Sequence, residues 1–365
     1  MKIVFLGFSK IKYLPYMHSY LDQIDKDKNE VHLIYWDRDE AIDDEVPKGV
    51  VPHCYKCYML DSFPMRKKVG PISGYGKYAK KIIREICPDF MFVLHSTTAI
   101  TIYNLLCGKY KGKYIFDYRD VTYEKHLFYK NLIAKIVSNS VYTFTSSDGF
   151  RIYLPEIPEK VLTSHNLLRS SLSKHEKYKG RIKRLDTEPI RIAFWGMIRQ
   201  REFNEVIINR LGGDKRFELH YYGRVSILFE DTLRRSQEVY SNVFYHGEYI
   251  PSDRDEFADK TDILHNLYSN NDATMPLAMS NKYYDGLIYY LPQLCMKDSY
   301  MGDMCEKHCI GLTCDPHKDG FADNVYEYYR NLDLREFEEK CDITLDAILS
   351  QVENDETIIR SIVNV

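Results

Sequence analysis

The sequence of 365 residues lacks any long uninterrupted apolar run. Its most apolar region, residues 90–106, is interrupted by His95, by Ser-Thr-Thr at 96–98 and by Asn104. A membrane-spanning helix needs about 20 predominantly apolar residues, so this region does not fit one. Met1-Lys2 leads directly into IVFLGF, which is too short for the apolar part of a secretory signal and is typical of a buried strand. We therefore expect a cytoplasmic protein.

The sequence also lacks regular cysteine spacing and a large excess of charge of either sign. The nine cysteines are odd in number and irregularly spaced, so we expect reduced thiols. His53-Cys54-x-x-Cys57 and Cys305-x-x-His308-Cys309 each offer two or three zinc ligands, but neither has the paired spacing of a structural zinc site. With 50 basic and 53 acidic residues, the net charge of -3 gives no support for a nucleic-acid partner.

The first part of the chain shows hydrophobic segments that alternate with helical patterns. Strands are predicted at 2–8, 30–36, 88–95, 112–120, 140–147 and 161–166, with helices at 13–24, 75–86, 97–107 and 124–138 between them. Such alternation indicates a parallel sheet with helices on both faces. Gly7 follows the first strand but belongs to no G-x-G-x-x-G fingerprint, which argues against an NAD-binding domain.

The alternation restarts after the polar, basic segment 171–188. Strands are predicted at 190–196, 217–223, 242–249, 272–277 and 293–296, with helices at 200–211, 226–239, 260–270 and 280–291 and a mostly helical tail from about 321. The predicted organisation is a domain at 1–170, a linker at 171–188, a domain at 189–345 and a C-terminal helix at 346–365 that packs back across the interface. The predicted fold class is α/β, with two Rossmann-like, doubly wound domains facing each other across a cleft.

One short helix, within SNKYYDGLIYYLPQ (280–293), carries an unusual set of polar residues in its first turns. Ligands of open α/β sheets bind beyond the carboxyl ends of the strands, and a helix N-terminus favours phosphate. Lys282 adds a positive charge there, Asp285 can accept hydrogen bonds from vicinal hydroxyls, and Gly286 permits close backbone approach. The pattern predicts a site for a sugar nucleotide diphosphate. The alternative is a capped surface helix with an ion pair.

The same segment, NKYYDGLIYYLPQL, resembles the N-K-x-x-E-x-x-x-x-x-x-P segment of retaining GT-B glycosyltransferases of the family-4-like group 1 type. It is most similar to the bacterial surface-polysaccharide enzymes. The resemblance implies that Asn281, Lys282 and Asp285 hold the diphosphate and the ribose. The sequence departs from the pattern in two ways: Asp285 replaces a glutamate, and Leu277 stands where many relatives carry a glutamate that contacts the donor sugar.

The resemblance also implies roles for three glycine loops of the second domain. In FWGMIRQREF (194–203), the turn at Gly196 is followed by Arg199, and then Arg201, near the donor phosphates. Gly223-Arg224 and His246-Gly247 fall where the family places loops around the nucleotide base. Taken alone, a glycine after a strand indicates only a turn.

On the first domain, the resemblance places acceptor and catalytic groups at strand ends. Asp120 would orient or deprotonate an acceptor hydroxyl, His95 would hydrogen-bond the sugar or the acceptor, and Gly7 with Phe8 would form a loop near the acceptor. The alternatives are that Asp120 pairs with Arg119 or caps the next helix, and that His95 is a core histidine.

Two charged segments have competing interpretations. Asp37-Arg38-Asp39 is similar to the metal-binding D-x-D of GT-A enzymes, but two Rossmann-like halves do not suit that fold. Residues 66–84 contain seven basic and no acidic residues. In the family this part often approaches the membrane, where clustered Lys and Arg favour anionic head groups. A solvated basic face or an acceptor-phosphate site are the alternatives.

The combined prediction is a metal-independent, retaining glycosyltransferase. It would move a sugar from a UDP- or GDP-linked donor to a saccharide or lipid-linked saccharide in capsule, exopolysaccharide or lipopolysaccharide assembly, with no cofactor. We expect it in the bacterial cytoplasm, with a peripheral contact to the inner face of the cell membrane. The alternatives are a non-catalytic scaffold of the same fold and a nucleotide-sugar epimerase.

Overall fold

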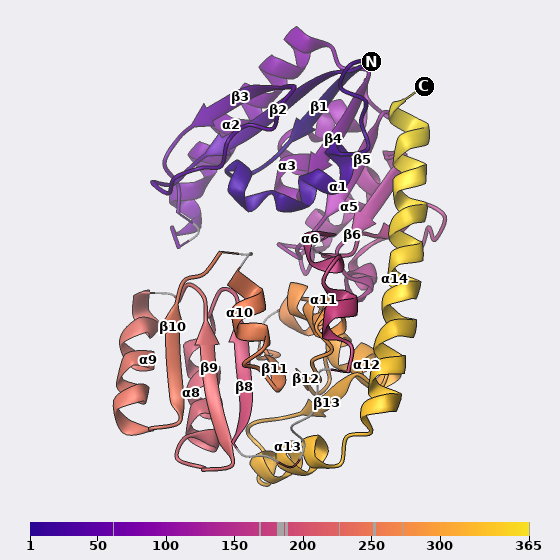
Figure 1. Cartoon of the computed structure of the whole chain (residues 1–365). Coiled ribbons are helices and arrows are strands. Elements are labelled where there is room, and N and C mark those ends of the chain that lie inside the picture. The colour runs from indigo at the N-terminus through magenta and orange to yellow at the C-terminus, as the bar shows by residue number, and fades with distance from the viewer. Residues whose placement is uncertain are drawn as a thin grey trace. The chain divides into compact units, whose positions relative to one another are not determined.

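A computed structural model of the chain describes residues 1–60, 62–167, 169–180, 186, 189–225, 227–250, 253–271 and 273–364. The chain divides into two compact units. Unit 1 comprises Met1–His165 with Ser350–Val365, and unit 2 comprises Asn166–Leu349 (Figure 1). The later part of the predicted linker, 181–185 and 187–188, lies outside the described residues.

Unit 1 is built on a seven-stranded parallel sheet of order β3-β2-β1-β4-β5-β6-β7. The strands are β1 (Lys2–Leu6), β2 (Glu30–Asp37), β3 (Val50–Lys56), β4 (Phe90–Leu94), β5 (Tyr114–Tyr118), β6 (Tyr142–Thr145) and β7 (Val161–Thr163). The helices are α1 (His18–Leu21), α2 (Met65–Ile86), α3 (Ser96–Thr101), α4 (Tyr103–Leu106), α5 (Leu127–Asn139) and the last turns of α14 (Leu334–Val363).

The core of unit 1 forms on both faces of this sheet. On one face, Phe5 of β1 stacks on Phe92 of β4 at 4.5 Å between ring centroids, and Ile359 of α14 joins the same cluster. On the other face, α2 buries Tyr75, whose hydroxyl donates to the Gly7 carbonyl at 2.6 Å. β4 and β5 are buried along their whole length, as expected for central strands covered on both faces.

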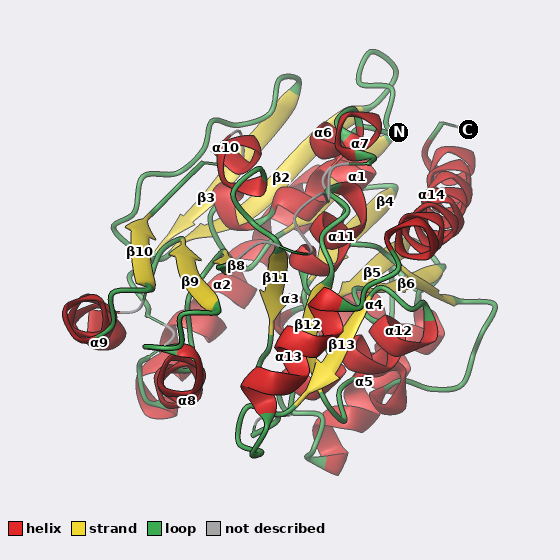
Figure 2. Cartoon of the chain, turned by 60° about the horizontal axis from the view of Figure 1, so that its bottom comes forward, coloured by secondary structure: helices red, strands yellow, loops and turns green. Residues whose placement is uncertain are grey.

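Unit 2 repeats the plan with a six-stranded parallel sheet of order β10-β9-β8-β11-β12-β13. The strands are β8 (Ile190–Trp195), β9 (Phe217–Tyr222), β10 (Val243–Gly247), β11 (Ile263–Asn266), β12 (Gln293–Met296) and β13 (Gly311–Cys314). The helices are α6 (Arg169–Leu172), α7 (His175–Tyr178), α8 (Arg201–Leu211), α9 (Ile227–Val239), α10 (Arg254–Ala258), α11 (Asn281–Ile288), α12 (Tyr300–Lys307) and α13 (Phe321–Arg330), with the first part of α14. Figure 2 shows helices flanking the strands in each unit.

Two sequence predictions of secondary structure are wrong, and strands β3 and β13 were not predicted. The predicted helix 260–270 contains strand β11, and the predicted strand 272–277 contains a short 3-10 helix at Met275–Leu277, while Asp272 lies outside the described residues. β11 is only four residues long and includes His265 and Asn266, which hide its apolar character. Edge strand β3 was not predicted because none of its residues is fully buried and it contains Pro52.

The predicted fold class is confirmed: each unit is a Rossmann-like α/β domain with a parallel sheet. Within the described residues, no helix combines the length and apolarity that a membrane span requires. Because all strands of a parallel sheet point the same way, the loops after β8, β9, β10 and β11 gather at one edge of unit 2. That edge positions the candidate site.

Candidate functional site

Lys282 is buried in an aromatic setting at the start of α11. Its side chain is 5 % exposed, and its ammonium lies 4.0 Å from the ring centroid of Phe194 on β8 and 4.7 Å from that of Tyr268 beyond β11. It also donates a hydrogen bond to the Tyr268 hydroxyl. These contacts are cation–π interactions of a largely desolvated charge. The site therefore holds a full positive charge close to the carboxyl edge of the sheet.

Asp285 lies one turn later on α11 and forms a buried ion pair. The Arg254 guanidinium donates to one carboxylate oxygen at 2.9 Å, and the side chains are 9 % and 3 % exposed. The second oxygen, Oδ2, is buried without a hydrogen-bond partner among the described residues. Burial raises the pKa of Asp285, while Arg254 and Lys282 act in the opposite direction. An unpaired carboxylate oxygen of this kind can accept a hydrogen bond from a ligand hydroxyl.

His265 of β11 is a buried neutral residue whose ring lies 5.3 Å from that of Phe194, the ring that Lys282 also contacts. Its Nδ1 accepts from the Leu267 amide at 3.1 Å, so the proton lies on Nε2, which has no partner among the described residues. Burial and the nearby Lys282 lower the pKa of His265 to about 3. The imidazole is therefore uncharged at neutral pH, and the buried charges described at this site are those of Lys282, Arg254 and Asp285.

The loops after β8 and β9 are joined backbone to backbone through two glycines. Gly196 and Gly223 have φ values of 123° and 134°, which side chains rarely adopt. A Cβ atom at Gly223 would overlap the carbonyl of Gly196. Ile198 donates its amide to the Arg224 carbonyl at 2.8 Å, and Gly223 donates to the Gly247 carbonyl at 2.7 Å. Three predicted loops thus form one continuous rim.

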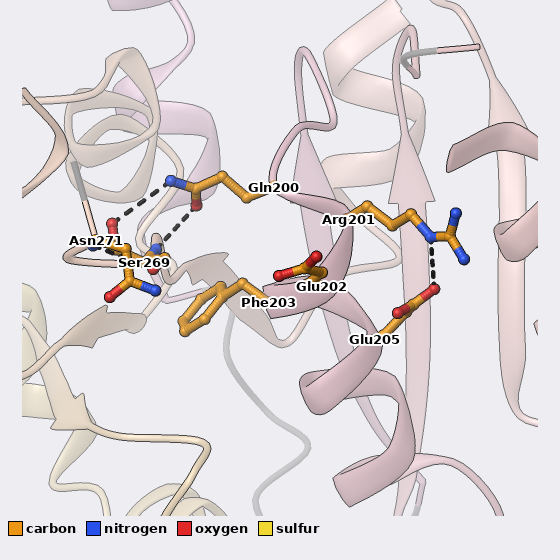
Figure 3. Close-up of a pocket in the computed structure, with 7 residues that line it drawn as sticks. All are labelled: Gln200, Arg201, Glu202, Phe203, Glu205, Ser269 and Asn271. Carbon is orange, nitrogen blue, oxygen red and sulfur yellow. Dashed lines mark hydrogen bonds and ion pairs between the residues drawn. The ribbon is translucent and has the colours of Figure 1, made fainter. Parts of the chain in front are cut away.

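A cavity of about 640 Å³ opens where α8 begins (Figure 3). It is lined by Gln200, Arg201, Glu202, Phe203, Glu205, Ser269 and Asn271. Gln200, in a left-handed conformation with φ of 55°, accepts from the Ser269 amide at 2.8 Å and so ties the β8 loop to the β11 loop. Arg201 pairs with Glu205 at 2.8 Å on the exposed side of the cavity.

The remaining residues that were predicted to bind the donor are either exposed to solvent or explained by packing. Arg199 and Arg224 are exposed on the rim, and Asn281 is exposed at the first position of α11. Ser280 donates its hydroxyl to Asn266 at 2.8 Å and does not cap α11. A Cβ atom at Gly286 would overlap the Gln293 amide, so packing against β12 accounts for this glycine without a ligand.

In unit 1, the structure brings Phe8 and His95 together at the ends of β1 and β4. Their rings stack at 5.8 Å between centroids and 10° between planes. His95 has a φ of 82°, and its Nδ1 accepts from the Thr97 amide at the start of α3. Gly7 packs against Leu14, where a Cβ atom would overlap the side chain. Phe8 and His95 therefore lie together in the loops that follow β1 and β4, at the carboxyl edge of the sheet.

Asp120 is exposed after β5, and the buried ion pair nearby belongs to Asp117 instead. Arg119 donates to Asp117 at 2.6 Å, so Asp117 takes the position that the alternative interpretation gave to Asp120 as the partner of Arg119. Asp37 and Asp39 lie 3.1 Å and 2.9 Å from the ammonium of buried Lys10. One lysine therefore forms ion pairs with both carboxylates of the D-x-D segment. Among the described residues, no group of three or more His, Cys, Asp or Glu side chains is placed to hold a metal ion.

Comparison with known proteins identifies the fold. No protein-family model matches the sequence, and no curated protein matches it. Solved structures do match over nearly the whole chain. Sucrose-phosphate synthase from Thermosynechococcus elongatus has 9 % identity, a TM-score of 0.69 and coverage of 99 % of this chain and 98 % of that one. WaaG, a glycosyltransferase involved in lipopolysaccharide biosynthesis, has 14 % identity, a TM-score of 0.65 and coverage of 98 % and 99 %. HepE from Anabaena, solved in complex with UDP, has 11 % identity, a TM-score of 0.62 and coverage of 100 % and 98 %.

The chain has the GT-B fold. At these identities the likeness concerns the fold alone, and the roles of the site residues rest on the geometry above. Arg254, His265 and Tyr268 were not predicted from the sequence. Arg254 stands between acidic neighbours in SDRDE, a pattern typical of an exposed loop, and only the packing of α10 beside α11 places it on Asp285.

Proposed function

We propose that this GT-B chain is a glycosyltransferase that moves a sugar from a nucleoside diphosphate sugar to a saccharide or lipid-linked saccharide. The observation that carries the proposal is the buried set at the carboxyl edge of unit 2: the ammonium of Lys282, the guanidinium of Arg254 and the unpaired oxygen of Asp285. The carboxylate could accept hydrogen bonds from the ribose hydroxyls, and the two cations could bind the negatively charged diphosphate. HepE, with the same fold, is solved with UDP and with UDP-glucose, so UDP is the first nucleotide to test, followed by GDP.

In the proposed reaction, the bond between the anomeric carbon and the diphosphate oxygen breaks, and its electron pair goes to the diphosphate. Lys282, with Arg199 and Arg201 on the rim, would stabilise that developing charge, and no metal would be required. The acceptor hydroxyl oxygen bonds to the anomeric carbon with retained configuration, and its proton goes to a base, for which we propose Asp120. His95 and the Gly7-Phe8 loop would position the acceptor. In this proposal, Asn281 and Gly286 belong to the donor-binding side, and Gly196, Gly223 and Arg224 surround the nucleotide.

We also propose that the enzyme acts in bacterial surface-polysaccharide assembly, from the cytoplasm, with unit 1 approaching the inner membrane through the basic segment 66–84. Leu277, where many similar enzymes carry a sugar-binding glutamate, favours a second candidate, a scaffold protein of the GT-B fold without catalysis. A scaffold would bind no nucleotide in the donor site.

The test is a thermal-shift panel of UDP, GDP, CDP, ADP, dTDP and NAD, each with and without EDTA. A ligand at ~100 times its dissociation constant stabilises by about 2.7 kcal/mol, which shifts the melting temperature by at least about 2 °C. We expect one diphosphate to give a shift that EDTA does not change. That shift should vanish in Lys282→Met and persist in Lys215→Met, which alters an exposed lysine of the same unit. If no nucleotide shifts the wild type, the scaffold is favoured.

A further inference from the structure

A second cavity of unit 2 opens at the carboxyl ends of β12 and β13. Its volume is about 820 Å³, within the range of roughly 300–1,000 Å³ that is typical of small-molecule sites. None of the described residues that line it belongs to the proposed donor site around Lys282 and Asp285. Edge strand β13 is three places from β8 in the sheet, which corresponds to about 14 Å at a strand spacing of about 4.8 Å. We call this separate cavity the β13 cavity.

One part of the lining of the β13 cavity is apolar and partly aromatic. It comes from the end of β12, from β13 and from α13, and consists of Met296, Leu312, Phe321 and Tyr328. Phe321 is buried, so its ring belongs to a wall that packing holds in place. A pyranose ring has an apolar C–H face, and contact with such a wall removes apolar area from water.

The other part of the lining carries polar side chains of both signs. They are two lysines, three carboxylates and one exposed amide: Lys297, Lys318, Asp298, Asp315, Glu327 and Asn324. Because two positive charges stand beside three negative ones, the lining does not attract a phosphorylated ligand. Hydroxyl groups both donate and accept hydrogen bonds, so a rim that mixes donors with acceptors suits a ligand rich in hydroxyls.

Asn270, which also lines the cavity, has a buried oxygen in need of a donor. Its amide nitrogen donates to the Lys297 carbonyl at 2.9 Å and to the Asp298 carbonyl at 3.3 Å. Because carbonyls only accept hydrogen bonds, these contacts fix which way the amide is turned. Its Oδ1 is buried without a hydrogen-bond partner among the described residues. A ligand hydroxyl at this wall would supply the missing donor.

The turn after β12 is shaped in advance of any ligand. Asp298 has a φ of 58°, a left-handed conformation that few residues other than glycine adopt. Asn270 holds this turn through the two carbonyls, and the Ser299 hydroxyl accepts from the Gly302 amide at 3.1 Å and so caps α12 directly after it. A rim that is already ordered loses less conformational entropy when a ligand binds.

We propose that the β13 cavity binds a neutral saccharide. A pyranose ring packs on Phe321 and Tyr328, and its hydroxyls bond to Lys318, Glu327 and Asn270. This goes beyond the proposed function, because it gives unit 2 a second carbohydrate site that takes no part in donor binding. Since saccharide binding is measured without turnover, failure of this proposal would leave the proposed transferase activity standing.

The experiment is saturation-transfer NMR on the full chain, titrated with the methyl glycosides of glucose, galactose, mannose, rhamnose and N-acetylglucosamine. Glucose 6-phosphate and glucosamine are the anionic and cationic comparisons. We expect at least one neutral glycoside to bind, and both charged sugars to bind at least tenfold more weakly. UDP should not displace the glycoside, and Lys282→Met should bind it as tightly as the wild type does.

A pair of double variants locates the bound sugar. Lys318→Met with Glu327→Met removes two polar side chains of the rim without changing the net charge, and should weaken binding at least tenfold. The matched control, Lys307→Met with Glu238→Met, makes the same replacements at exposed positions of unit 2 outside the cavity and should bind normally. Because Lys318 and Glu327 are also exposed, we expect the rim variant to remain folded, which its melting temperature checks.

Several results would overturn the proposal. One is that no neutral glycoside binds the wild type at millimolar concentration, or that only the charged sugars bind. Another is that the rim variant binds as tightly as the wild type, which would place the sugar in another part of the chain. Displacement of the glycoside by UDP, or its loss in Lys282→Met, would place the sugar in the donor site instead.

Discussion

The guanidinium of Arg254 lies 2.9 Å from a carboxylate oxygen of Asp285, and both side chains are buried within unit 2. Removing one member of a buried pair leaves an uncompensated charge, which costs about 3–5 kcal/mol. We therefore expect Arg254→Leu to lower the free energy of unfolding of unit 2 by about that amount at pH 7, measured by urea denaturation. Arg234→Leu, which breaks an exposed pair with Glu230, should cost less than about 1 kcal/mol.

The pH dependence of that variant provides a separate check. Burial raises the pKa of Asp285, and loss of Arg254 would raise it further. A protonated carboxyl no longer needs its cation, so the cost of Arg254→Leu should shrink as the pH falls from 7 to 5. A cost that is constant or grows over this range would show that Asp285 stays ionised and solvated.

Asp285→Asn tests the proposed contact with ribose. The amide keeps an oxygen for Arg254 but replaces the unpaired Oδ2 acceptor with a donor. We expect UDP affinity to fall at least tenfold by calorimetry. The sharper readout is 2′,3′-dideoxy-UDP: the wild type should bind it as weakly as the variant binds UDP, and the variant should not distinguish the two ligands. Equal discrimination by both proteins would remove Asp285 from the ribose site.

Gly223→Ala tests the rim of glycine loops. The new methyl group would overlap the Gly196 carbonyl at a φ of 134°. We expect a loss of at least about 3 kcal/mol in the free energy of unfolding, since the strained backbone and the overlap both oppose the change. Gly320→Ala is the control: its φ is 78°, but a Cβ atom there meets no neighbour, so about 1 kcal/mol is expected. Similar losses in the two variants would mean that the rim can relax.

Asp355, on the part of α14 that belongs to unit 1, should make stability depend on pH. Burial raises its pKa to about 7, from about 3.9 in an unfolded chain. Between these values the folded state binds the proton more tightly, so this group favours folding at low pH and the benefit is lost as the pH rises from about 4 to 7. Asp355→Asn should therefore raise the free energy of unfolding at pH 8 by roughly 2 kcal/mol, allowing for its partial exposure, and have little effect at pH 4. Glu353→Gln, an exposed position on the same helix, serves as the control for the loss of one charge.

Much of the fold could be predicted from the sequence because long, strongly apolar strands such as Lys2–Leu6 and Phe90–Leu94 are covered on both faces and need no polar alternation. The errors fall where tertiary context outweighs local pattern. β11 is short and carries two polar residues that are completely buried by its neighbours, and β3 is an exposed edge strand with a proline.

The residues of the candidate site also fall into two groups, those that the sequence predicted and those that it did not. Lys282 and Asp285 could be found from the sequence, because their spacing on one helix is a local property. Arg254 lies 31 residues from Asp285, and Tyr268 lies 14 residues from Lys282. No periodicity links such positions, and the contacts arise from the order of strands in the sheet.

By itself, the sequence determined two Rossmann-like α/β units with parallel sheets and a helix that carries Lys282 and Asp285 in its first turns, because strand burial and helix spacing are set by residues close together in the chain. Only the tertiary structure decided that Asp285 pairs with Arg254, that Lys10 forms ion pairs with both Asp37 and Asp39, and that the Tyr123 hydroxyl reaches the Met65 sulfur. Such pairings depend on which distant elements the parallel sheets bring to the same edge, and that information is not local to any segment.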